Sequence, residues 1–266
     1  MTPVAVVRGG SPLVLGFPHT GTYVPSEIFS CLNANGRRLS DTDWHIDQLY
    51  DGLIPDVTIV KANFHRYVID ANRDPAGASL YPDQATTTLI PLTDFDGMNI
   101  WQTAPTSDDI RHRTAHYHAP YHAALTAELE RVRNVHGAVV LYDCHSIRSH
   151  VPFLFDGVLP DFNIGTDSGA TCAPEVESEA AAICKAAPGF SSALNGRFRG
   201  GWTTRHYGRP QSGFHAIQME LAQSTYLADE AAPWPYDPKK AVRLRPYLAD
   251  ILTNLAALAL RLGGTS

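Results

Sequence analysis

The stretch Gly137-Ala-Val-Val-Leu-Tyr-Asp-Cys-His-Ser-Ile-Arg148 decides the fold class, because an uncharged apolar run ends abruptly in polar residues. Residues 139–142 are apolar and begin with two β-branched valines, which predicts a buried strand. His145 then lies at the carboxyl end of that strand, where α/β sheets usually bind their ligands. Pro12-Leu-Val-Leu-Gly-Phe-Pro-His-Thr-Gly21 repeats the pattern and places His19 at a second strand end. The two histidines together predict one metal ion held between two strands.

Apolar runs that alternate with helical patterns predict an α/β fold. Strands are expected at residues 13–17, 57–61, 66–70, 138–142 and 215–220, and helices at 43–51, 107–135, 174–187 and 238–262. The second helix is expected to break near Pro120, because proline suits the first turn of a new helical piece. The alternation predicts a three-layer sandwich, with a mixed, mostly parallel sheet and helices on both faces. Residues 72–97 and 196–212 are predicted to be long loops, which in compact domains are often functional.

Composition limits the classes of protein to consider. The 266 residues, 44% hydrophobic and 18% charged, fit one domain over residues 1–266 better than two small ones. A net charge of -6 without a basic stripe argues against nucleic-acid binding. The four cysteines form no CxxC pair, so a reducing compartment is expected. No signal peptide or membrane-spanning stretch is recognised, which favours the cytoplasm.

A third metal ligand is needed beside the two histidines, because a catalytic zinc usually has three protein ligands and one open position. Asp43 and Asp47 lie four residues apart, so on a helix they would share one face. Asp43 is favoured, because it lies nearer the helix start and can face the strand ends. The alternative is that an aspartate here only caps the helix.

Four further histidines lie at helical spacing: His112, His116, His118 and His122. Pairs four residues apart can bind metal on a helix, but no Glu follows the first histidine of either pair as in HExxH. A substrate contact, assigned to His118, is therefore favoured over a metal ligand from this cluster. Cys144 and Ser146 are not expected to be nucleophiles, since adjacent side chains on a strand point apart and the chain has no GxSxG motif.

Glu220 is the candidate general base, in Phe214-His-Ala-Ile-Gln-Met-Glu-Leu-Ala-Gln223. On a strand, Ala216, Gln218 and Glu220 share one face. A glutamate in an apolar strand is costly unless it is paired or used. A structural salt bridge is the alternative, but the nearby candidate ligands favour a carboxylate that moves the proton of an attacking water.

Arginines at two places predict a small anionic substrate. Asn72 and Arg73 follow the strand expected at 66–70, and the glycine-rich segment 196–212 adds Arg205 and three more arginines. Arginine binds carboxylates with two parallel hydrogen bonds. Arg73 and Arg205 are favoured as substrate contacts, and Arg205 also as support for an oxyanion. Arg197 and Arg209 are expected to be solvated.

Seven stretches, taken in order, resemble the N-formylglutamate amidohydrolase (N-formylglutamate deformylase) family. Each alone is weak, but the ordered set is specific and runs from about residue 12 to 227. The matching stretches are Pro18-His-Thr-Gly-Thr-Tyr-Val-Pro25, Asp41-Thr-Asp-Trp-His-Ile-Asp47, Arg66-Tyr-Val-Ile-Asp-Ala-Asn-Arg-Asp-Pro75, Tyr117-His-Ala-Pro-Tyr-His122, Tyr142-Asp-Cys-His-Ser-Ile-Arg148, Gly200-Gly-Trp-Thr-Thr-Arg-His-Tyr-Gly-Arg-Pro210 and His215-Ala-Ile-Gln-Met-Glu-Leu-Ala-Gln223.

The resemblance implies a phosphorylase/hydrolase-like sandwich, similar to that of zinc carboxypeptidases. It implies hydrolysis of N-formyl-L-glutamate to formate and L-glutamate, a step of histidine degradation, with Zn²⁺ or another divalent metal. The implied roles are metal ligands for His19, Asp43 and His145, general base for Glu220, and substrate-carboxylate binding for Asn72 with Arg73. The chain departs from the carboxypeptidase HxxE pattern, because no Glu stands three residues after His19.

Two other functions remain open from the sequence. One is an amidase or deformylase that acts on another N-acyl amino acid or on a peptide. The other is a protein that binds small anions without a metal.

Overall fold

The computed structural model describes residues 1–78 and 87–264. Seven strands in the described residues form one mixed sheet, in the order β1-β3-β2-β4-β7-β5-β6. The four central strands β3, β2, β4 and β7 run parallel, whereas β1 and β5 pair antiparallel with their neighbours β3 and β7. The bounds are β1 Val4–Val7, β2 Leu13–Phe17, β3 Thr58–Ala62, β4 Val139–Ile147, β5 Phe162–Gly165, β6 Ser192–Leu194 and β7 Phe214–Ala222.

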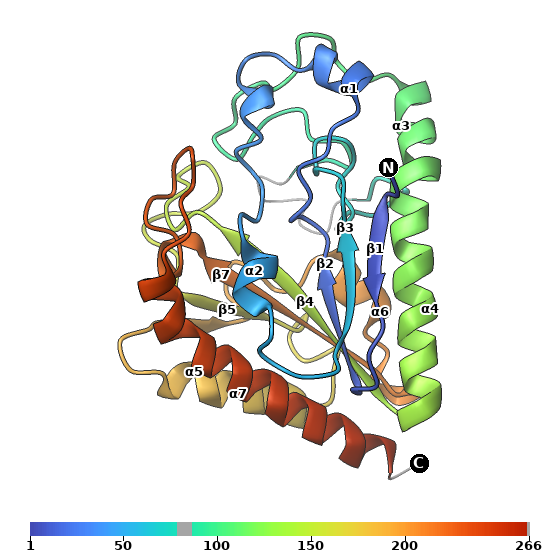
Figure 1. Ribbon diagram of the computed structural model, residues 1–266, viewed down its shortest axis with the longest axis vertical. Coiled ribbons are helices and arrows are strands. Elements are labelled where there is room, and N and C mark those ends of the chain that lie inside the picture. The colour runs from blue at the N-terminus through green and yellow to red at the C-terminus, as the bar shows by residue number, and fades with distance from the viewer. Residues whose placement is uncertain (79–86, 265–266) are drawn as a thin grey trace.

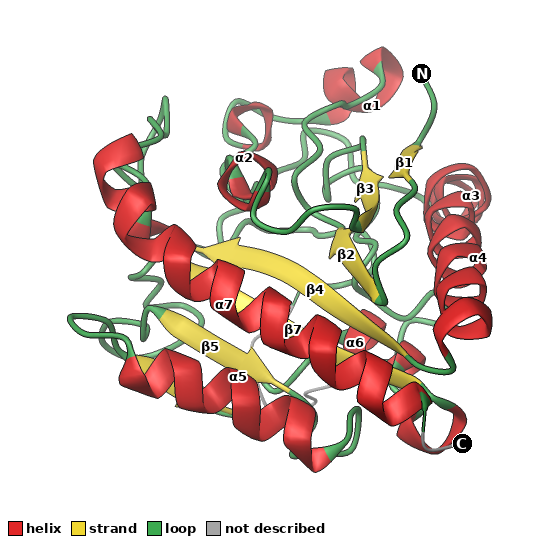
Figure 2. Ribbon diagram, turned by 60° about the horizontal axis from the view of Figure 1, so that its bottom comes forward, coloured by secondary structure: helices red, strands yellow, loops and turns green. Residues whose placement is uncertain are grey.

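Helices cover both faces of this sheet. On one face lie α5 and α7 with the short α2, and on the other lie α4 and α6 (Figures 1 and 2). The bounds are α1 Ser26–Cys31, α2 Ile46–Tyr50, α3 Ser107–Arg113, α4 Ala119–His136, α5 Pro174–Ala186, α6 Trp202–Tyr207 and α7 Pro238–Gly263. The predicted three-layer α/β sandwich is confirmed. None of the described helices is long and apolar enough to cross a membrane.

The two-residue period of the central strands sorts their side chains between two cores. In β4, Val140, Tyr142 and Cys144 pack in the core under α7 and α5, whereas Val139 and Leu141 pack in the core under α4. Continued alternation turns Asp143 and His145 toward the α4 face as well. The end of β4 lies beside α6 and the loops rather than under α4, and polar side chains can form a site there.

Three expectations about local structure need correction. Residues 66–70 are a buried turn and not a strand: Val68 N–H donates to His65 C=O at 2.9 Å, so the apolar run curls back on itself. The helix expected from residue 43 begins at Ile46, after His45 with a left-handed φ of 56°. Segment 196–212 is not all loop, because it contains α6.

The helix expected to break near Pro120 does not break: residues 107–136 stay helical, with a π-helical turn, Thr114–His118, between α3 and α4. Strands β1, β5 and β6 were not anticipated. They are only three or four residues long, so their stretches are too short to show the period of a strand.

Candidate active site

A cavity of about 590 Å³ opens at the carboxyl ends of the central strands. Its lining includes the predicted ligands His19, Asp43 and His145 and the predicted base Glu220. His19 comes directly after β2, and His145 and Glu220 lie near the ends of β4 and β7. The parallel strands therefore bring residues that are far apart in sequence to one edge of the sheet.

The three predicted ligands converge in the structure. Asp43 Oδ2 lies 3.3 Å from His145 Nδ1 and 3.8 Å from His19 Nδ1, and all three side chains are buried. Backbone contacts hold Asp43 in place: its N–H donates to His19 C=O at 3.1 Å, and its Oδ2 accepts from Ser146 N–H at 3.1 Å. Asp43 lies in a turn before α2, so its position depends on these contacts rather than on a helix face.

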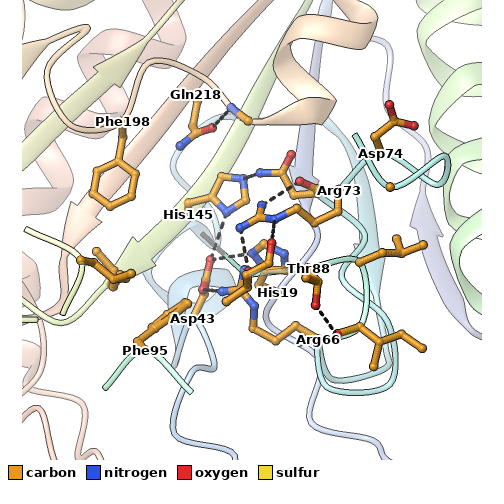
Figure 3. A pocket seen from close by; sticks show the side chains of 18 of the residues that line it. His19, Asp43, Arg66, Arg73, Asp74, Thr88, Phe95, His145, Phe198 and Gln218 are labelled. Carbon is orange, nitrogen blue, oxygen red and sulfur yellow. Dashed lines mark hydrogen bonds and ion pairs between the residues drawn. The ribbon is translucent and has the colours of Figure 1, made fainter. Parts of the chain in front are cut away.

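Each histidine is oriented by a second carboxylate. His19 Nε2 lies 2.7 Å from Asp70 Oδ1, and His145 Nε2 lies 3.0 Å from Asp143 Oδ2. A histidine that donates Nε2–H to a carboxylate keeps Nδ1 unprotonated for a metal. Both Nδ1 atoms face Asp43, as Figure 3 shows for His19 and His145.

This donor set fits a zinc ion. One atom from each of His19, Asp43 and His145 lies within 4.8 Å of the other two, and no other such group occurs in residues 1–78 and 87–264. Two imidazole nitrogens and one carboxylate are a usual set for catalytic zinc, with the fourth position open to water or substrate.

Burial and neighbouring charges shift the pKa values of these groups. Burial acts to lower the pKa of His145. The carboxylates of Asp143 and Asp43 outweigh burial, so the pKa of His145 is raised well above its usual value. For His19, burial and the Arg66 guanidinium lower the pKa despite Asp70. Burial acts to raise the pKa of Asp70, but Arg66 and His19 hold it well below its usual range. Three carboxylates, those of Asp43, Asp70 and Asp143, thus surround His19 and His145, and this arrangement favours a bound cation.

Glu220 stands beside this centre. It pairs with His145 in the register of β4 and β7, so both side chains leave the same face of the sheet. Its Oε2 accepts a hydrogen bond from Gln218 Nε2 at 3.2 Å. Burial raises the pKa of Glu220 to about 8. The positive charge of His145 opposes this shift, and the carboxylate of Asp43 adds to it. Perturbed carboxylates in a cavity are candidates for general bases.

Arg66 is a site residue that the sequence analysis did not single out. Its Nη2 donates to Asp70 at 2.7 Å, and its Nη1 lies 4.0 Å from Asp43. Its Nε has no hydrogen-bond partner among the described residues, and the side chain lines the cavity. A signal was present, because a buried arginine four residues before an aspartate needs a pairing. Asp70, Asp143 and Gln218 were also not assigned roles.

The predicted substrate contacts divide into two groups. Asn72 and Arg73 line the cavity, and Asn72 Oδ1 accepts from Thr203 N–H at 2.8 Å. Arg205 is not among the lining residues, because α6 directs it to Asp167 at 3.2 Å. His118 Nε2–H donates to Arg73 C=O at 2.9 Å, and the side chain borders a second hollow beside α6.

Comparison with known proteins agrees with this geometry. The family model for N-formylglutamate amidohydrolase matches residues 11–227. The chain belongs to the N-formylglutamate amidohydrolase family. It is 44% identical over 253 residues to an N-formylglutamate deformylase of Pseudomonas aeruginosa, and 42% identical over 254 residues to one of Pseudomonas putida, with 94% of each chain covered. The family predicted from the seven stretches is confirmed.

Solved structures show the same fold. The N-formylglutamate amidohydrolase of Ralstonia eutropha JMP134 superposes with a TM-score of 0.81 at 26% identity, covering 98% of this chain and 99% of that one. The Atu2144 gene product of Agrobacterium tumefaciens has a TM-score of 0.73 at 16% identity, covering 98% and 97%, and shares the fold.

Proposed function

We propose that this protein is a zinc-dependent hydrolase that converts N-formyl-L-glutamate to formate and L-glutamate. The buried cluster of His19, Asp43 and His145, with Glu220 beside it in one cavity, carries the proposal. Membership in the N-formylglutamate amidohydrolase family and the deformylase names of two relatives support the same substrate.

His19, Asp43 and His145 would hold the zinc ion, which would supply Lewis-acid chemistry for the formyl carbonyl and for the attacking water. Glu220 accepts the proton of that water and delivers it to the departing amide nitrogen. Arg66 places a buried positive charge beside Asp43, where it can hold negative charge that develops on the carbonyl oxygen. Asp70 and Asp143 keep the two histidines oriented throughout.

The carboxylates of the substrate would be bound by side chains that line the cavity. Asn72 Oδ1 accepts from Thr203 N–H, and Asn72 Nδ2 lies 3.2 Å from His145 Nε2, so the Asn72 amide forms part of the cavity wall beside His145. Arg73 and Arg197 also line the cavity: the Arg73 guanidinium donates to Thr87 and to Asn72 C=O, and Arg197 Nε donates to Leu154 C=O. Arg197, expected to be solvated, thereby replaces Arg205 as the candidate for the second carboxylate.

The test combines metal analysis with formate release. We expect about one zinc per chain and loss of turnover on chelation. We expect Glu220→Gln to keep the metal and KM but to lower kcat by about 10²–10⁴-fold, the usual range for general acid–base groups. The matched control is Glu128→Gln, a buried glutamate that pairs with Arg8 and Arg131 outside the cavity, and it should retain kcat.

Three results would contradict parts of the proposal. Near wild-type turnover of metal-loaded Glu220→Gln would show that Glu220 is structural. Full activity in metal-free protein would remove the role assigned to the His19, Asp43 and His145 cluster. Faster hydrolysis of another N-acyl amino acid than of N-formylglutamate would show that N-formylglutamate is not the preferred substrate.

A further inference from the structure

We propose that Gln218 is a positioning residue for Glu220: its amide holds one oxygen of the carboxylate and leaves the other for proton transfer. The inference rests on the proposed function, because it assumes that Glu220 is the base. Both residues lie on β7, two positions apart, and both line the cavity.

The orientation of the Gln218 amide is determined by the backbone. Gly201 N–H donates to Gln218 Oε1 at 2.7 Å, just before α6 (Figure 3 shows this contact at Gln218). A backbone N–H can only donate, so it requires the oxygen of the amide and turns the NH₂ group the other way. That NH₂ group meets Glu220 Oε2 at 3.2 Å. A flipped amide would lose both hydrogen bonds.

The two oxygens of Glu220 are therefore not equivalent. Oε2 is held by Gln218, whereas Oε1 has no hydrogen-bond partner among the described residues. Gln218 is 3% exposed and Glu220 7%, so water competes little for the hydrogen bond between them. A carboxylate held by one oxygen keeps its free oxygen in one direction, which a general base needs in order to reach its proton.

The neighbouring strand β4 repeats this arrangement. Asp143, two residues before His145, accepts from the imidazole of His145 at 3.0 Å. Gln218 and Asp143 are paired in the register, as are Glu220 and His145. On both strands the functional side chain is thus oriented by the residue two positions earlier on the same face.

A double-mutant cycle with Glu220 tests the proposal. In metal-loaded protein we expect Gln218→Met to lower kcat by about ten- to a hundredfold with little change in KM, as for loss of a hydrogen bond to a charged group. In the Glu220→Gln background, the same Gln218→Met change should lower kcat by less than about twofold, because a residue that acts through Glu220 has nothing left to orient.

Two further variants separate positioning from folding. Gln218→Glu keeps an acceptor for Gly201 N–H but loses the donor to Glu220, so it should lower kcat even if Gln218→Met folds poorly. The matched control is Thr171→Val, which removes a buried hydrogen bond of 2.8 Å to Ala216 C=O on the same strand without touching Glu220. It should retain wild-type kcat and show no coupling to Glu220→Gln.

The outcomes are distinguishable. An equal loss from Gln218→Met in both backgrounds would show that Gln218 is only structural and would overturn the inference, as would wild-type kcat in both Gln218 variants. In either case an inactive Glu220→Gln would leave the proposed function standing. High turnover of Glu220→Gln would instead overturn the base assignment itself.

Discussion

At the scale of single residues, the proposed metal centre includes carboxylates outside the proposed ligand set. Asp70 and Asp143 are fully buried, and each lies within 3.0 Å of the Nε2 of one histidine. A neutral imidazole carries its proton on only one nitrogen, so the carboxylate decides which nitrogen faces the metal. We infer that Asp70 and Asp143 select the tautomer and hold the ring of each histidine.

We predict that Asp143→Asn weakens zinc binding by about ten- to a hundredfold, the usual effect of removing such a carboxylate partner. The Asn side chain keeps the size of Asp143 but loses the charge that supports His145. Competition with a fluorescent chelator measures the zinc affinity. Asp161→Asn is the control, because Asp161 accepts from Ser191 and is not among the cavity-lining residues. Equal zinc affinity in Asp143→Asn and wild type would show that Asp143 does not support the ligand.

At the scale of elements, the short α6 and the turn before it connect two amides of the site. Gly201 N–H binds Gln218, and Thr203 N–H binds Asn72. Gly201 is required there by close approach: a Cβ atom would lie 2.3 Å from Asn72 Nδ2 and 2.6 Å from Asn72 Oδ1. The turn therefore sets the direction of both amides together.

We predict that Gly201→Ala lowers kcat/KM for N-formylglutamate by at least about tenfold, because small displacements of positioning groups can reduce rates strongly. Steady-state formate release measures this effect, and zinc content is measured beside it, because Asn72 Nδ2 lies 3.2 Å from the proposed ligand His145. Gly264→Ala is the control, because its Cβ would meet no atom closer than 3.5 Å. Wild-type kcat/KM in Gly201→Ala would mean that the turn can shift without moving Asn72 or Gln218.

At the scale of the whole molecule, His122 joins α4 to α6 and to the segment that carries Asn72. Its Nε2 lies 2.8 Å from Ala71 C=O, and its Nδ1 lies 3.0 Å from the Tyr207 hydroxyl. Burial lowers the pKa of His122 to about 3. The neighbouring His118 adds to this shift, and the hydrogen bond to Ala71 C=O opposes it. The fold thus accepts His122 only as a neutral ring.

This shift predicts an acid-sensitive fold. Because the folded-state pKa lies below the unfolded value near 6.5, the stabilisation is complete above about pH 6.5 and is lost as the pH falls toward 3. The contribution of His122 should decrease by about 1.4 kcal/mol for each pH unit in that window. Urea unfolding of metal-free protein at pH 7 and pH 5 should show a shallower pH dependence for His122→Gln than for wild type. Exposed His116→Gln should keep the wild-type slope, and an unchanged slope in His122→Gln would contradict the assignment.

Local patterns in the amino-acid sequence were enough to predict the fold class and to indicate the candidate site. Apolar runs and the alternation of side chains predicted the strands β2, β4 and β7. The polar residues at the ends of these strands indicated His19, His145 and Glu220. These features are local, because a strand's period and the point where it becomes polar can be read without knowing its neighbours. Asp43 depended on the family resemblance as much as on spacing, since it lies outside the helix that was expected to carry it.

Which side chains meet depends on contacts that form only in the folded chain. Residues 66–70 are buried as a turn, and an apolar run alone does not distinguish that from a strand. Arg205 turns to Asp167 because α6 forms within a segment predicted as loop. The partners of His19 and Gln218 come from segments 51 and 17 residues away. Burial and period are properties of a short stretch, whereas the direction of a side chain and its partner depend on contacts between distant stretches.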